Sequence, residues 1–141
     1  MVRRETLKFL TEEWQAEFEP ALLDAFSAGK TPTKLSVTFC QGFAAVPQLN
    51  GSDFWYRYTF SDGVLTKIEK GNSMASAPES DYTSFGEYGV AVKVMTGEMG
   101  AAKALMSGKI KMKGSVTKAL KLLDTYNLVQ ETMALGGKTE W

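Results

Sequence analysis

The sequence predicts an α+β fold, and three of its features carry that prediction. Apolar residues recur at helical spacing near both ends of the chain, whereas several short segments between them alternate apolar and polar residues as half-buried strands do. An Asp-Gly dipeptide between two of these segments is a strong signal for a hairpin. The 141 residues can build one hydrophobic core, so we expect residues 1–141 to form a single domain.

The amino-terminal segment is expected to be helical. Glutamates occupy the side opposite an apolar stripe made of Leu7, Leu10, Trp14 and Phe18. Pro20 lacks a backbone N–H, so it should break or restart this helix. A second helical piece, residues 21–29, should then end near Gly29.

Residues 33–40, 53–60 and 64–70 are the first expected strands. One face of the first strand is apolar and consists of Leu35, Val37 and Phe39. The other two strands flank residues 61–63, which contain the Asp-Gly turn, and should pair as a hairpin. The aromatic face of residues 53–60 should close on the helices and comprises Phe54, Tyr56, Tyr58 and Phe60. Residues 41–52 and 71–80 are expected to be loops because they are rich in residues that favour turns.

The remaining elements follow in short succession. Residues 81–85 should form a strand, and residues 86–97 and 98–108 two helices that end at Gly97 and Gly108. Residues 109–114 alternate strictly, so Ile110 and Met112 should face one way and three lysines the solvent: Lys109, Lys111 and Lys113. Ser115 is well placed to cap a helix whose inward residues are Val116, Ala119, Leu120 and Leu123. Residues 126–141 form an amphipathic segment, of which residues 136–141 should fray.

Composition narrows the chemistry. Sixteen basic residues balance sixteen acidic ones, which favours no nucleic-acid partner. Histidine is absent, which excludes the usual forms of imidazole-based acid/base, serine, cysteine and zinc catalysis. The lone Cys40 cannot form an internal disulfide or a cysteine metal cluster, so we expect no metal and no cofactor. No segment has the character of a signal peptide or a membrane span, and a cytoplasmic location is expected.

The segment from 97 to 114 carries a specific pattern of small, basic and apolar residues. The pattern consists of Gly97, Glu98, Met106, Gly108, Lys109, Ile110, Lys111, Met112, Lys113 and Gly114, followed by an amphipathic stretch. It resembles the signature of the sterol carrier protein type 2 family, and the order of expected elements is similar to that family along nearly the whole chain. The resemblance implies a mostly antiparallel sheet of about five strands, covered by helices and enclosing an apolar tunnel. It also implies non-catalytic binding or transfer of a hydrophobic small molecule: a sterol, a fatty acid or a fatty acyl thioester.

The candidate ligand-binding residues are the inward apolar and tyrosine side chains of these elements. They are Leu35, Val37, Phe39, Tyr56, Tyr58, Val94, Ala101, Ala104, Leu105, Met106, Ile110, Met112, Ala119, Leu120 and Leu123. Two alternatives stay open: an enzyme that uses a tuned carboxylate or tyrosine in the same pocket, and an interaction or oligomerisation domain whose core is filled by side chains. Transient contact with a membrane surface is a further expectation.

Overall fold

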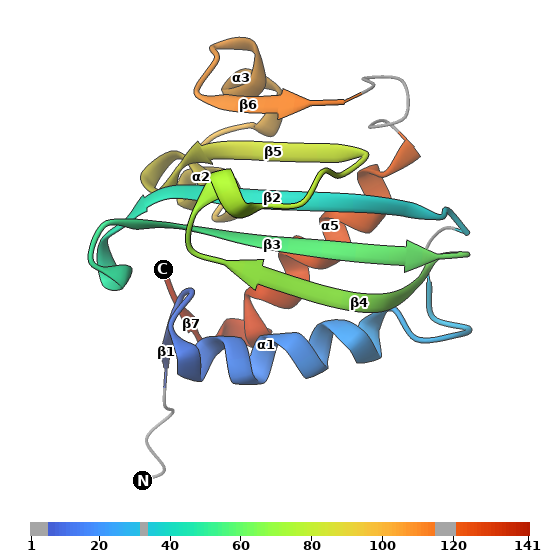
Figure 1. Ribbon diagram of the computed structural model, residues 1–141. Coiled ribbons are helices and arrows are strands. Elements are labelled where there is room, and N and C mark those ends of the chain that lie inside the picture. The colour runs from blue at the N-terminus through green and yellow to red at the C-terminus, as the bar shows by residue number, and fades with distance from the viewer. Residues whose placement is uncertain (1–5, 32–33, 115–120) are drawn as a thin grey trace, which may run out of the picture.

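A five-stranded sheet with the strand order β4-β3-β2-β5-β6 forms the centre of the computed structural model, which describes residues 6–31, 34–114 and 121–141 (Figure 1). Its strands are β2 (Val37–Val46), β3 (Ser52–Ser61), β4 (Val64–Gly71), β5 (Tyr82–Glu87) and β6 (Ile110–Lys113). Neighbouring strands are antiparallel except β2 and β5, which are parallel. The predicted mostly antiparallel sheet is therefore confirmed.

The described helices lie behind the sheet and along its edges, and they are α1 (Glu12–Ala25), α2 (Tyr88–Met95), α3 (Ala101–Met106) and α5 (Leu123–Met133). In Figure 1, α5 crosses behind the sheet, α1 runs below β4, and α3 stands beside the opposite edge strand, β6. The aromatic side chains expected on one face of β3 are all buried in the core: Phe54, Tyr56, Tyr58 and Phe60. The sheet therefore buries the face that the alternation predicted.

The hairpin between β3 and β4 has the expected turn. Asp62 and Gly63 both have positive φ, 52° and 83°, which is the conformation that an Asp-Gly pair adopts in a two-residue hairpin. The backbone N–H of Asp62 donates to the hydroxyl of Ser36, 2.9 Å away, and ties the turn to the segment before β2.

Strand β2 is longer than predicted, because it continues through residues expected to be a loop. Gly42, which favoured a loop, lies within the strand where the segment after β4 crosses the sheet. A Cβ at this position would lie 2.7 Å from the Sδ atom of Met74 and 2.9 Å from the Phe85 ring. Glycine here permits close packing rather than a turn. The irregularity comes later, between Phe43 and Val46, where the register with β3 shifts.

Helix α1 also differs from the prediction, both in where it begins and in how it accommodates Pro20. It begins at Glu12, and the Thr11 side chain accepts the first capping bond from the Trp14 N–H at 3.5 Å. Pro20 lies inside the helix and does not break it. Pro20 and Ala16, whose carbonyl loses its helical partner, are both exposed, so water can satisfy that carbonyl. The buried inward face of the helix continues on both sides of the proline.

The two ends of the described chain pair with each other, contrary to both sequence predictions for them. Leu7, expected to be helical, lies in β1 (Leu7–Lys8), which pairs in parallel with β7 (Thr139–Glu140). The side-chain amine of Lys8 donates to the carbonyl oxygen of Trp141 at 2.7 Å, and the Phe9 and Trp141 rings lie 4.8 Å apart. The expected fraying of residues 136–141 is therefore wrong for the last three residues. Local propensity gives no information on a pairing across more than 130 positions.

Ser115 and most of the helix expected after it lie outside the described residues. Within the part that is described, no helix combines the length and apolar character needed to cross a bilayer.

Candidate functional site

Aromatic side chains fill most of the space between the sheet and the helices α1 and α5. Tyr56 and Tyr58 are fully buried, and their rings stack 5.8 Å apart. The Tyr56 hydroxyl donates to a carboxylate oxygen of Glu19 at 3.1 Å, and the Tyr58 hydroxyl donates to Oε1 of Gln41 at 3.3 Å. Burial raises the pKa of both phenols, so both stay protonated. These two tyrosines are part of the core.

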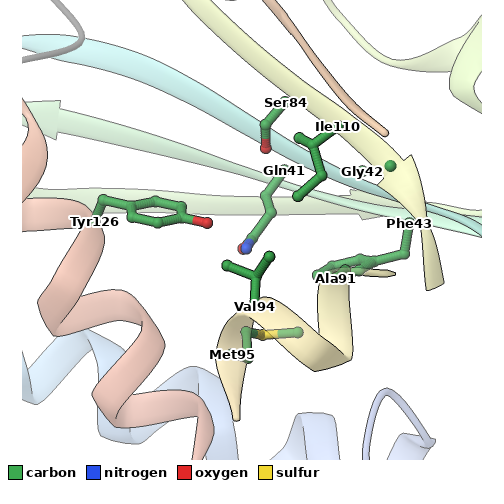
Figure 2. Close-up of a pocket in the computed structure, with 10 residues that line it drawn as sticks. Gln41, Gly42, Phe43, Ser84, Ala91, Val94, Met95, Ile110 and Tyr126 are labelled. Atoms are coloured by element: carbon green, nitrogen blue, oxygen red, sulfur yellow. The ribbon is translucent and has the colours of Figure 1, made fainter. Parts of the chain in front are cut away.

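A small cavity lies where the sheet, α2 and α5 meet, and we call it the polar-lined cavity (Figure 2). Its free volume is about 20 Å³, which holds about one water molecule. The lining residues are Gln41, Gly42, Phe43, Ser84, Gly86, Ala91, Val94, Met95, Ile110 and Tyr126. Gln41 and Ser84 are direct neighbours in the register of β2 and β5, so the sheet itself places their side chains together.

Three neutral polar groups point into this cavity from three elements. Figure 2 shows the Gln41 amide, the Ser84 hydroxyl and the Tyr126 hydroxyl directed toward a common space above Val94. Gln41 and Ser84 are buried, with 4% and 7% of their surface exposed. Within the described part of the chain, the Ser84 hydroxyl and the amide nitrogen of Gln41 have no hydrogen-bond partner. These two groups are therefore free to form hydrogen bonds with a molecule in the cavity.

Tyr126 is poised to donate a hydrogen bond. Its hydroxyl accepts one from Nε2 of Gln130 at 3.0 Å, and its own proton has no acceptor among the described residues. Burial raises the pKa of Tyr126, although the bond from Gln130 acts in the opposite direction. The phenol therefore stays neutral near pH 7.

A second small cavity lies between the sheet and α5 and also has Tyr126 in its lining, and we call it the apolar cavity. Its lining residues are Phe39, Phe60, Leu122, Thr125, Tyr126 and Val129, and its free volume is about 20 Å³. Tyr126 belongs to both linings and packs edge-to-face on Phe39, with ring centroids 5.9 Å apart. The two cavities therefore share Tyr126 as part of their walls.

The structure brings some of the predicted site residues to these cavities and leaves others elsewhere. Val94 and Ile110 line the polar-lined cavity, and Phe39 lines the apolar one. Leu35 and Val37 are partly buried against the core, and Ala104 is fully buried. Four predicted residues are exposed and line neither cavity: Leu105, Met106, Met112 and Leu123. Ala101 is the first residue of α3, and Ala119 and Leu120 lie outside the described residues.

The polar residues of the site were missed because the sequence prediction ended the first strand at Cys40. Extending its alternation by one step makes Gln41 the next inward residue after Phe39. A single glutamine within an inward apolar stripe is the signal that could have located the site. Ser84, at an inward position of β5, and Tyr126, in α5, become recognisable only when the sheet register is known.

The linings of these cavities offer apolar surface and neutral hydrogen-bonding groups. Neither cavity has a charged side chain in its lining. Among the described residues, no group of three or more cysteine and acidic side chains is placed to hold a metal ion. The arrangement suits a largely apolar molecule with one uncharged polar group.

No protein-family model matches the sequence, and no curated protein matches it. Solved structures do match. The crystal structure of a sterol carrier protein 2 is 16% identical, with a TM-score of 0.60 over 87% of this chain and 92% of that chain. A conserved hypothetical protein from Thermus thermophilus is 16% identical, with a TM-score of 0.61 over 92% of this chain and 87% of that one. Palmitated SCP2L2 from Aedes aegypti is 16% identical, with a TM-score of 0.50 over 76% and 92%. These likenesses confirm the predicted fold, that of sterol carrier protein 2.

Proposed function

We propose that this protein is a non-catalytic carrier of a hydrophobic small molecule with an uncharged polar group. The observation that carries the proposal is the convergence of the Gln41 amide, the Ser84 hydroxyl and the Tyr126 hydroxyl on a cavity with otherwise apolar walls. The fold supports the hydrophobic part of the proposal, because one structure of the same fold, that of the Aedes aegypti protein, is palmitated.

Binding requires the two cavities to join, since each holds about one water molecule as it stands. Tyr126 belongs to both linings, and we propose that a rotation of its side chain opens one continuous space along the inner face of the sheet. The methionine and valine side chains of α2 can repack around an irregular guest. Each buried methylene of the ligand then contributes about 0.8 kcal/mol.

The polar groups favour a neutral head. A hydroxyl or carbonyl oxygen would accept hydrogen bonds from Gln41, Ser84 and Tyr126. A carboxylate would lose its hydration with no cation in the lining of either cavity to compensate, and an unpaired buried charge is costly. We therefore place sterols, fatty alcohols and fatty acyl esters or thioesters ahead of free fatty acids.

The test is a titration with a neutral fluorescent fatty alcohol, with Ala91→Phe as the blocking variant. Ala91 is buried and lines the polar-lined cavity, so a phenyl ring there should occupy ligand space and weaken binding at least tenfold. The ring should also cost about 1–3 kcal/mol of stability, because the cavity is smaller than the ring. Ala16→Phe makes the same change at an exposed position of α1 and should leave binding unchanged.

Failure of the wild-type protein to bind the alcohol saturably would reject the carrier and favour an interaction domain with a filled core. Equal binding by the wild type and Ala91→Phe would show that the ligand lies elsewhere.

A further inference from the structure

The segment of residues 97–114, which contains α3 and β6, combines exposed large apolar side chains with exposed lysines. We call it the α3–β6 corner; Figure 1 shows it at one edge of the sheet, opposite α1. Three of the five exposed large hydrophobic side chains in the described part of the chain lie here: Leu105, Met106 and Met112. Met106 is 89% exposed, an unusual position for an unbranched apolar side chain.

The charge of the corner is equally uneven. It contains four lysines and one glutamate, a net charge of +3, and because the whole chain is neutral the remaining residues carry −3. The lysines are Lys103, Lys109, Lys111 and Lys113, and all four are exposed, as predicted for the last three. None of the ion pairs in the described part of the chain involves them, whereas four other lysines pair with carboxylates.

We infer that the α3–β6 corner docks on an anionic phospholipid surface. Long lysine stems let the ammonium groups lie among phosphates while Met106 and Leu105 enter the acyl boundary. Charge complementarity favours a negative surface, because the corner carries a net charge of +3 and no ion pair among the described residues neutralises its lysines.

The corner is continuous with the candidate site. Strand β6 supplies both, because Ile110 lines the polar-lined cavity while Lys111 and Lys113 alternate with it on the opposite face of the strand. Docking would therefore bring one wall of the cavity to the bilayer from which a water-insoluble ligand must come. This inference deepens the proposed function. The docking itself requires no carried ligand, and only its purpose, the uptake of a lipid, rests on the proposed function.

The experiment is vesicle flotation of the full chain without any carried ligand, so its result is independent of the ligand titration. The vesicles are phosphatidylcholine alone and phosphatidylcholine with roughly a third phosphatidylglycerol. The wild type should float with the anionic vesicles, should not float with the neutral ones, and should be released by salt. Replacing Lys109, Lys111 and Lys113 together by glutamine should weaken binding by about 100-fold, and Met106→Ser by about tenfold.

Two control variants make the same chemical changes away from the corner. Glutamine at Lys30, Lys34 and Lys67 together removes the same charge from other exposed positions, and Leu23→Ser removes another exposed apolar side chain. Both should bind within about twofold of the wild type. Urea denaturation checks that each variant is folded, and Met106→Ser carries the test alone if the triple variant is not.

Three results would overturn the inference. The first is no flotation with anionic vesicles. The second is an equal loss of vesicle binding in the corner and control lysine variants, which would show that binding depends only on the net charge of the protein. The third is a wild-type dimer in sedimentation velocity that Met106→Ser dissociates, which would assign the corner to a second copy of this chain.

Discussion

The hydrogen bond between Tyr58 and Gln41 allows the candidate site to be tested by a double-mutant cycle. The Tyr58 hydroxyl is fully buried, and its partner is Oε1 of Gln41. Gln41→Leu removes that acceptor and leaves the hydroxyl unsatisfied, which costs about 1–3 kcal/mol. The 3.3 Å distance is long for a hydroxyl donor, so we expect about 1 kcal/mol. Tyr58→Phe should cost a similar amount, because it leaves the amide oxygen without its donor.

The double variant should be close to the wild type in stability, since removing both partners leaves no orphaned group. Urea denaturation of the four proteins should therefore give a coupling energy of about 2 kcal/mol, above the usual scatter of about 0.3–0.5 kcal/mol. In ligand titrations, Gln41→Leu should lower the affinity for a fatty alcohol by about two- to tenfold and leave the affinity for an alkane of equal length unchanged. Additive losses of stability would show that the bond is not formed, and equal effects on both ligands would show that the amide does not contact the head.

Three further predictions concern stability. Burial raises the pKa of the Cys40 thiol from its ordinary value of 9.0 to about 11, so between these values only the unfolded chain loses the proton. The free energy of unfolding should therefore fall as pH rises from 9 to 11, by at most about 1.4 kcal/mol per pH unit from this group, and in a pH series of denaturation curves Cys40→Ala should lack that part of the slope. Thr139→Val removes the acceptor, 2.9 Å away, of the buried Trp14 indole N–H, and should cost about 1–3 kcal/mol in urea; an unchanged midpoint would show that β7 adds nothing. Gly71→Ala would place a Cβ 2.6 Å from the Trp55 ring and should cost about 1–3 kcal/mol in the same assay; a neutral result would mean that the ring moves freely.

The sheet was predictable from the sequence because its signals are local. Alternation located β3 and β6, the Asp62-Gly63 pair located the hairpin that joins β3 to β4, and β5 was expected as a short strand. Glycine misled at Gly42, where its role is to admit the Met74 side chain rather than to turn the chain. Pro20 misled for a similar reason, since a solvent-facing proline is compatible with a helix whose other face is firmly buried.

What could not be predicted depends on contacts between distant parts of the chain. The pairing of Leu7 with Thr139 leaves no local trace. The site has the same origin, because Gln41 and Ser84 become neighbours through the parallel pairing of β2 with β5, and α5 adds Tyr126 to them. Periodicity shows which side chains point inward, but only the register shows which of them meet. The predicted tunnel stays a prediction, since two of the residues expected to line it, Ala119 and Leu120, are outside the described part of the chain.

The central claim, that the inner face of the sheet takes up a lipid with a neutral head, is tested most directly by native mass spectrometry. The purified chain is incubated with an equimolar mixture of a sterol, a fatty alcohol, a fatty acyl thioester and a fatty acid, each of distinct mass. We predict complexes of one ligand per 15.5 kDa chain, with the neutral ligands more abundant than the acid and all of them depleted in Ala91→Phe. A spectrum that contains only the unliganded mass, or complexes that Ala91→Phe retains in full, would contradict the claim.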